Sequence, residues 1–495
     1  MLAMLPIIVV MAVVFGILLG VRGDRITILA LAAVTFVVAC VPLVVDLARP
    51  GERRHVFISL LGLIFMIHYA VPALVFYVPA TGGVPAPAMS TEVWPPDAIR
   101  GQLVALVGLV SLLLGYASPA GRVASTFLPK PKYDWSADVT LMVACVFIGT
   151  SWLLNAAALA GLVPPWVGTG FVGVFAHYYF YANALLVVLI LRDRSAAALL
   201  VLVPNLLLAV SYGVFTSRKS QMLVGPMIVL LTYMLWTGRV RLRWFAAGAA
   251  VIALVYPMSQ FVRYELGGQT RTLELLTDPA KTIDAIGDFI SSDKTSFAQG
   301  LEATGARLDG LGVTSVIVRD TPSVSDFQNG RTIWLFFVAF IPRGLWPGKP
   351  DITLGGWITA VYGPGPQIKS ATGPTQIGDF YLNYGWWSVI GGMAILGAIL
   401  RAAYETLFRQ RTPMALLLQI VIVYHLVVRF EGGVGALWSS MIFALTPVIM
   451  AQLAVRLFFN LPVYSENDGE RGSSGAAAGL PADRGSGSAP LGSRS

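Results

Sequence analysis

The chain has 495 residues, of which 56% are hydrophobic and only 12% are charged, and its formal net charge is +8. Soluble proteins carry about 25% charged residues, so this composition excludes an ordinary soluble domain and indicates a membrane protein. The positive charge does not indicate nucleic-acid binding, because the basic residues lie in short loops between apolar runs, where they set topology. Cys40 and Cys145 each lie inside an apolar run, so no disulfide framework is expected.

Long apolar runs predict an all-α polytopic integral membrane protein. A spanning helix needs about 20 apolar residues, and on this criterion we expect about twelve spans. The first run lacks a basic start and a small-residue cleavage site, which predicts a retained helix rather than a signal peptide. The predicted spans lie near residues 3–21, 26–47, 56–79, 100–118, 138–163, 168–191, 196–216, 220–237, 244–262, 378–400, 413–428 and 434–458.

The loops predict the orientation of these spans. Lys and Arg gather after every second predicted span, whereas the loop at 80–99 contains neither. The positive-inside rule therefore predicts cytoplasmic N- and C-termini. The expected parts are a first block of spans, a large extracytoplasmic loop, a second block of spans and a disordered, Gly- and Ser-rich cytoplasmic tail. They cover residues 1–262, 263–377, 378–460 and 461–495.

The large loop combines two kinds of apolar segment. Ile283, Ile286, Phe289 and Ile290 recur at helical spacing, which predicts short amphipathic helices at the outer surface. Residues 332–341 are too short to span and too apolar to lie free in water, so we expect a re-entrant or interfacial segment that brings Arg343 to the membrane boundary.

The segment 340–385 mixes cations and aromatic residues with many Pro and Gly residues. This mixture predicts a shaped loop rather than a helix. Arg is suited to bidentate phosphate binding, and Lys supplies a point charge, so the outer cations predict an anion and glycan site at the membrane face. Each of them could instead be an interfacial residue whose charge reaches water. These cations are Arg218, Lys219, Arg263, Arg343, Lys349, Lys369 and Arg429.

No motif of nucleotide or metal chemistry accompanies these cations. The sequence has no Gly-rich loop ending in Gly-Lys-Ser/Thr, no GxSxG elbow and no Cys/His cluster at ligand spacing. ATP-driven transport and zinc chemistry are therefore not expected, and we predict neither a metal nor a cofactor.

Three strings carry a family resemblance: PRGLWPGKP, PTQIGDFYLNYG and SRKSQMLVGPMIVLL. They resemble the oligosaccharide repeat-unit polymerases of the Wzy type, which belong with O-antigen polymerases and ligases. The resemblance covers the region from about Ser211 to Trp438. It implies block transfer of a glycan from an undecaprenyl-pyrophosphate donor to a lipid-linked repeat unit, on the outer side of a bacterial inner membrane. A chain-length regulator and a flippase are the expected partners.

The chemistry implied by this resemblance assigns roles to residues. Arg218 and Arg343 are the first expected pyrophosphate contacts, followed by Lys349 and Arg429, with Arg263, Lys219 and Lys369 as further substrate contacts, because preplaced cations stabilise a leaving pyrophosphate. A general base must be a carboxylate or a histidine, and the candidates are Asp379, Glu431 and His425. Asp379 could instead cap a helix, and His425 could be a core residue. Tyr381, Tyr384 and Trp346 are predicted to contact sugars, although an interfacial aromatic belt explains such residues equally well.

Two alternatives remain open. A ligase would pass the glycan to a different acceptor from the same donor site. A transporter or flippase for lipid-linked oligosaccharide should carry polar residues deep in several helices, whereas here the ionisable residues gather near the outer face. The sequence leaves open the sugars, the linkage, the acceptor site and the oligomeric state.

Overall fold

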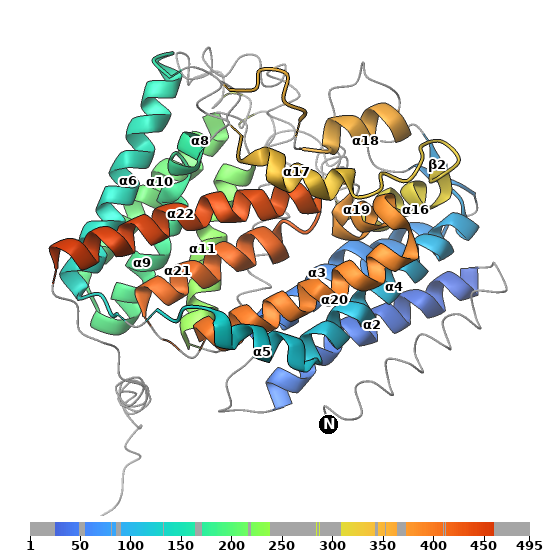
Figure 1. Cartoon of the computed structure of the whole chain (residues 1–495), viewed down its shortest axis with the longest axis horizontal. Coiled ribbons are helices and arrows are strands. Elements are labelled where there is room, and N and C mark those ends of the chain that lie inside the picture. The colour runs from blue at the N-terminus through green and yellow to red at the C-terminus, as the bar shows by residue number, and fades with distance from the viewer. Residues whose placement is uncertain are drawn as a thin grey trace, which may run out of the picture.

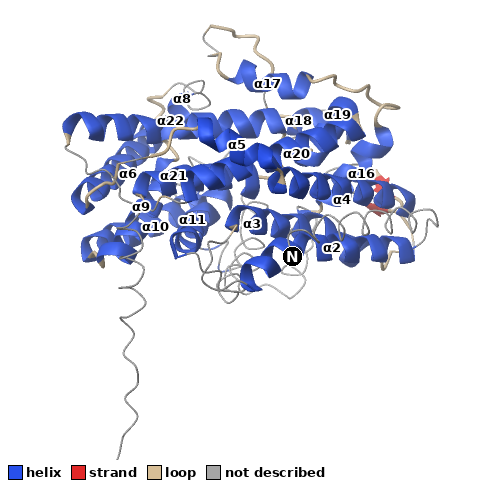
Figure 2. Cartoon of the chain, turned by 60° about the horizontal axis from the view of Figure 1, so that its bottom comes forward, coloured by secondary structure: helices blue, strands red, loops and turns tan. Residues whose placement is uncertain are grey.

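The computed structural model describes residues 25–48, 55–80, 82–85, 91–131, 133–163, 171–215, 219–237, 284, 287, 308–341, 345–351, 353–363, 373–408, 410 and 412–459. Helices form nearly all of the regular structure in this part of the chain (Figure 2). The antiparallel strands β1 (Val84–Pro85) and β2 (Glu92–Val93) form a short hairpin beside helix α16.

Seven helical runs among the described residues are long and apolar enough to cross a membrane. They confirm the prediction of a multi-pass, all-α membrane protein. The runs are Arg25–Asp46, Val56–Tyr77, Pro95–Ala117, Ala137–Leu159, Ala196–Gly213, Trp386–Phe408 and Val434–Phe458, and two shorter apolar helices cover Gln221–Thr237 and Pro413–Val428.

The helices follow one another along the chain with π-helical turns inside several of the apolar runs. Such turns are rare and occur frequently at functional sites. The elements are α2 (Arg25–Ala48), α3 (Val56–Phe65), η1 (Met66–Ala70), η2 (Ala73–Tyr77), α4 (Pro95–Ala117), α5 (Pro119–Phe127), α6 (Ala137–Leu159), α8 (Phe171–Phe175), α9 (Tyr178–Asp193), α10 (Ala196–Phe215), α11 (Lys219–Thr237), α16 (Gly310–Asp320), α17 (Arg331–Ala339), α18 (Gly355–Tyr362), α19 (Thr375–Tyr384), α20 (Trp386–Ala403), η4 (Tyr404–Phe408), α21 (Pro413–Ile422), η5 (Val423–Val428) and α22 (Val434–Phe458).

Small residues bring the spans α4 and α20 into close contact. A Cβ atom at Gly115 would collide with the carbonyl oxygen of Ala394, and one at Gly397 would collide with that of Leu112. Because glycine has no side chain, the two backbones approach each other directly, as is common between helices in membranes.

Helices α16 to α19 gather at one end of the bundle, where α4, α20 and α22 begin (Figure 1). We call these helices the α16–α19 layer. Helix α16 is buried over residues 310–318 and packs against α4 and α19. Helix α5 lies at the opposite end of α20 (Figure 1). The layer therefore covers one end of the spans and carries the residues described below.

Several predicted boundaries differ from the structure. The predicted span at 378–400 is divided at Gly385, whose φ of +61° is a conformation that glycine adopts readily. The predicted span at 168–191 is divided between α8 and α9. The interfacial segment predicted at 332–341 is helix α17. The predicted spans at 3–21 and 244–262 and the tail lie outside the described residues. Of the amphipathic helices predicted around residues 283–290, only Asp284 and Gly287 are described, both as helical.

Candidate functional site

The loop 429–433 connects η5 to α22 and lies at the centre of the predicted site. The amide of Arg429 donates to the carbonyl of Tyr424 over 3.0 Å, and the amide of Gly432 donates to the carbonyl of Arg429 over 3.0 Å. Phe430 is fully buried, with its ring centroid 4.9 Å from that of Phe65. The loop backbone is therefore held by its own hydrogen bonds and by the contact of Phe430 with Phe65 of α3.

Helix α19 begins directly on this loop. The amide of Thr375 donates to the carbonyl of Glu431, and the amide of Gln376 donates to that of Phe430, both over 3.0 Å. The first amides of a helix lack partners within the helix, so the loop satisfies two of them. The Gln376 side chain also donates to the carbonyl of Leu426 over 2.9 Å. Direct hydrogen bonds thus join α19 to loop 429–433, and both segments carry predicted site residues.

Thr375 holds an uncommon backbone conformation at this contact, with φ of +60°. For a β-branched residue this is a genuine outlier. Its hydroxyl accepts a hydrogen bond from Tyr69 in η1 over 3.0 Å and another from the amide of Gly378 over 3.1 Å. Outliers of this kind gather at functional sites, where the surrounding structure holds them.

The side chains of Arg429 and Glu431 are exposed on this fixed backbone. The guanidinium carbon of Arg429 lies 6.0 Å from the centroid of the Tyr424 ring, which is the limit for a cation–π contact. A cation and a carboxylate are therefore presented to the surroundings from one short, immobilised loop.

Asp379, predicted as a general base, lies inside α19 and is fully buried. Its Oδ2 accepts a hydrogen bond from the Val434 amide over 2.6 Å. Burial raises the pKa of Asp379 to about 6, which the hydrogen bonds from the Thr332 hydroxyl and the Val434 amide oppose. Its carboxyl group therefore caps the start of α22. The alternative stated above was that Asp379 caps the helix on which it lies itself.

His425, the second predicted base, is also buried, with 4% of its surface exposed. Its Nδ1 lies 2.9 Å from the carbonyl oxygen of Val421. A carbonyl can only accept, so Nδ1 carries the proton and Nε2 is the acceptor of the neutral ring. The sequence predicts that His425 and Arg429 share an α-helical face, but η5 has π-helical hydrogen bonds, and Arg429 is exposed where His425 is not.

Lys349, a predicted pyrophosphate contact, binds backbone carbonyl groups of the protein itself. It is 8% exposed, and its ammonium group donates to the carbonyls of Ala339 and Ile341 over 2.8 Å each. These carbonyls lie at the C-terminal end of α17, where cations interact favourably with the helix dipole. Trp346, three residues earlier in the chain, is 41% exposed.

The predicted sugar-contacting tyrosines differ in exposure. Tyr381 is 8% exposed, with its ring 6.3 Å from that of Phe327 and 6.4 Å from that of Trp386, whereas Tyr384 is 52% exposed. Burial raises the pKa of Tyr381. Of the two, Tyr384 therefore offers the larger surface for stacking.

The remaining predicted site residues lie beyond the described part of the chain. Lys219 is the first residue of α11, and only its backbone is described. Outside the described residues lie Arg218, Arg263, Arg343 and Lys369. Within the described part, no group of three or more His, Cys, Asp and Glu side chains is arranged to hold a metal ion.

Sequence reasoning missed two buried polar residues of the layer. Asp309 accepts hydrogen bonds from the Gly312 amide over 2.8 Å and the Tyr77 hydroxyl over 2.7 Å, and so ties the start of α16 to η2. Asn383 donates to the Thr332 hydroxyl over 2.6 Å and accepts from the Gly330 amide over 2.8 Å. Asp309 before the apolar stretch that starts at residue 311 is an N-cap signal, and Asn383 stands in the string PTQIGDFYLNYG.

Neither the family models nor the curated proteins nor the solved structures that we searched include a match to this chain.

Proposed function

We propose that this chain is a metal-independent glycosyltransferase of the cell envelope. It would polymerise lipid-linked oligosaccharide repeat units by block transfer from an undecaprenyl-pyrophosphate-linked donor on the outer side of a bacterial inner membrane. The observation that carries the proposal is the immobilised loop 429–433, which exposes Arg429 and Glu431 at the end of the bundle covered by the α16–α19 layer.

The proposed reaction requires a cation and a base close together. The acceptor hydroxyl oxygen attacks the anomeric carbon of the donor, and the bond from that carbon to the pyrophosphate oxygen breaks. The pyrophosphate leaves with the bonding electrons, and a carboxylate takes the proton of the hydroxyl. Arg429 would stabilise the leaving group, together with the predicted contacts Arg218 and Arg343, because fixed donors need no reorganisation as charge develops.

Glu431 is the carboxylate on this loop that a substrate hydroxyl can reach directly, since its side chain is exposed. Asp379 and His425 stay predicted bases, but both are buried in this structure. Asp379 also holds the Val434 amide that follows the loop. Its expected contribution is therefore to position the loop that carries Arg429 and Glu431.

The test is polymer length in cells that lack their own copy of the gene. Wild type should restore long glycan chains, whereas Arg429→Gln and Glu431→Gln should leave mainly single repeat units on the outer leaflet, with normal amounts of protein in the membrane. Arg331→Gln is the matched control, because Arg331 is an exposed arginine of the same layer, and it should polymerise normally.

Two results would overturn the proposal. If the gene deletion traps repeat units on the cytoplasmic leaflet, the chain is a flippase. If purified protein joins the glycan only to an acceptor other than the lipid-linked repeat unit, it is a ligase. Normal chain length in both loop variants would remove loop 429–433 from the site and leave Arg218 and Arg343 as its remaining predicted cations.

A further inference from the structure

His68 is a buried ionisable residue inside the candidate span Val56–Tyr77, next to loop 429–433. It is the middle residue of the π-helical turn η1, and only 7% of its surface is exposed. Its ring centroid lies 6.4 Å from that of Phe430, the buried residue of the loop. An ionisable side chain inside a span is energetically costly and is by default a candidate for function.

The ring of His68 is closely packed, but its polar atoms are not fully satisfied. Within the described part of the chain, the buried Nδ1 atom has no well-aligned hydrogen-bond partner. Gly310 at the start of α16 packs against this side of the ring, because a Cβ atom there would lie 3.1 Å from the Cβ of His68 and 3.4 Å from its Nδ1. The ring is therefore held in place without a hydrogen bond that would occupy Nδ1.

Two hydrogen-bond acceptors flank the ring. The carboxylate of Glu431 and the backbone carbonyl of Leu308 both lie close enough to interact with it. A neutral imidazole has one donor nitrogen and one acceptor nitrogen, so it can donate to only one of these neighbours, whereas the protonated ring can donate to both. The surroundings of His68 are thus suited to the uptake of a proton.

Hydrogen bonds tie the backbone of Glu431 to the turn that carries His68. The Thr375 amide donates to the carbonyl of Glu431 over 3.0 Å. Tyr69, which follows His68 in η1, donates its hydroxyl to the Thr375 hydroxyl oxygen over 3.0 Å. The loop that exposes Glu431 and the span that buries His68 are therefore connected through a single residue of α19.

We propose that His68 is the proton relay partner of Glu431, an inference that rests on the proposed function. The acceptor hydroxyl oxygen bonds to the anomeric carbon, and the pyrophosphate leaves with the electrons of the broken bond. The hydroxyl proton passes to the Glu431 carboxylate and from there to a ring nitrogen of His68. The regenerated carboxylate stabilises the imidazolium, which would be costly as an unpaired buried charge. After product release the proton returns through Glu431 to water.

His68 does not contact the substrate in this scheme and acts through Glu431. The test is the rate of glycan transfer by the purified full-length protein in lipid nanodiscs, with lipid-linked repeat units extracted from cells that lack the gene. His68→Asn and His68→Gln keep a polar side chain that cannot take up a proton, so each should lower kcat about a hundredfold. KM should not change, because Arg429 and the other donor contacts stay in place.

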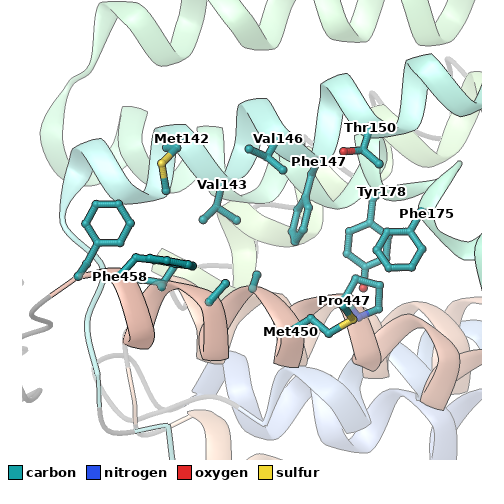
Figure 3. Close-up of a pocket in the computed structure, with 14 residues that line it drawn as sticks. Met142, Val143, Val146, Phe147, Thr150, Phe175, Tyr178, Pro447, Met450 and Phe458 are labelled. Atoms are coloured by element: carbon teal, nitrogen blue, oxygen red, sulfur yellow. The ribbon is translucent and has the colours of Figure 1, made fainter.

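A double variant separates a relay from a structural role. If His68 acts through Glu431, His68→Asn should cause little further loss when it is added to Glu431→Gln. His177→Asn is the matched control and should keep the wild-type rate. His177 is an exposed histidine that precedes Tyr178, a residue of the apolar pocket between α6 and α22 (Figure 3).

Three results would overturn the inference. Wild-type kcat in His68→Asn or His68→Gln would show that the ring only packs or forms hydrogen bonds. Losses that multiply in the double variant, or a raised KM with a lower melting temperature in the single variants, would assign His68 a structural role. In both cases a slow Glu431→Gln leaves the proposed function standing. If Glu431→Gln transfers glycan at the wild-type rate, the proposed base is wrong and the relay falls with it.

Discussion

Asp309 and Asp379 are buried carboxyl groups of the α16–α19 layer, and no Lys or Arg among the described residues pairs with them. Burial raises the pKa of each to about 6, above the ordinary value of 3.8 for an aspartate. Both side chains cap helices, α16 for Asp309 and α22 for Asp379. Their protonation therefore affects the attachment of the layer to the spans.

The raised pKa values predict how stability depends on pH. Between about pH 4 and pH 6 the folded protein binds more protons than the unfolded chain, so the free energy of unfolding falls as the pH rises through this window and is constant above it. Each group contributes roughly 3 kcal/mol at most. The variant Asp309→Asn with Asp379→Asn should lose this dependence in melting experiments from pH 4 to 7. Exposed Asp326→Asn should keep it, and an equal slope in the double variant would contradict the assignment.

Asn383 is fully buried, and its side chain makes hydrogen bonds to three other residues. It donates to the Thr332 hydroxyl and the Asp379 carbonyl and accepts from the Gly330 amide. Asn383→Ala should lower the free energy of unfolding by about 2–4 kcal/mol, because buried polar partners are left unsatisfied. Asn383→Asp would place a buried carboxylate oxygen against the Asp379 carbonyl and should be at least as destabilising as alanine in chemical denaturation. A loss below about 0.5 kcal/mol in Asn383→Ala would contradict this role.

Among the elements, the contact between α4 and α20 depends on glycine at defined positions. Gly397→Ala should push the helices apart, because the new Cβ meets the backbone oxygen of Leu112, which cannot rotate away. Gly391 lies on the same helix with nothing within 4 Å of the position of a Cβ. Gly391→Ala should therefore be neutral or gain up to about 1 kcal/mol from helix propensity. Equal melting temperatures for the two variants would exclude close packing as the cause.

Seven of the twelve predicted runs correspond to candidate spans among the described residues, because a span requires length and apolar composition. The run predicted at 56–79 is found as a candidate span over Val56–Tyr77. Its π-helical turns could not be predicted, since they change the hydrogen-bond partners and not the composition. Helix α16 could not be placed either, because its burial depends on α4 and α19, which are distant in sequence.

Two segments that carry predicted site residues lie together in the structure, whereas the roles of these residues stay predictions. Asp379 and Glu431 are both predicted bases, and the structure joins α19, which carries Asp379, to loop 429–433, which carries Glu431. The cap formed by Asp379 could not be foreseen, because its partner Val434 is 55 positions away. The partners of Lys349 could not be predicted, because a cation in a Pro- and Gly-rich loop gives the same sequence pattern whether it contacts a ligand or, as here, backbone carbonyls.

On the scale of the whole molecule, the predicted orientation places α5 in the cytoplasm and the α16–α19 layer outside. In a background that lacks Cys40 and Cys145, a membrane-impermeant maleimide should label Asp326→Cys in intact spheroplasts. Thr126→Cys should be labelled only after the membrane is permeabilised. Both positions are exposed, one before α17 and the other on α5. The reverse pattern would invert the topology and place loop 429–433 on the cytoplasmic side.

The hydrogen bonds of α19 also determine when the layer can assemble during synthesis. Its partners in η1 are translated early, but Phe430, Glu431 and Val434 leave the ribosome only after α19 itself has been made. Until then the amides of Thr375 and Gln376 and the carboxyl of Asp379 lack these partners. A nascent chain arrested before residue 430 should therefore expose α19 to protease, whereas one arrested after α22 should protect it. Loop 429–433 and the start of α22, which are translated after α19, thus complete the α16–α19 layer.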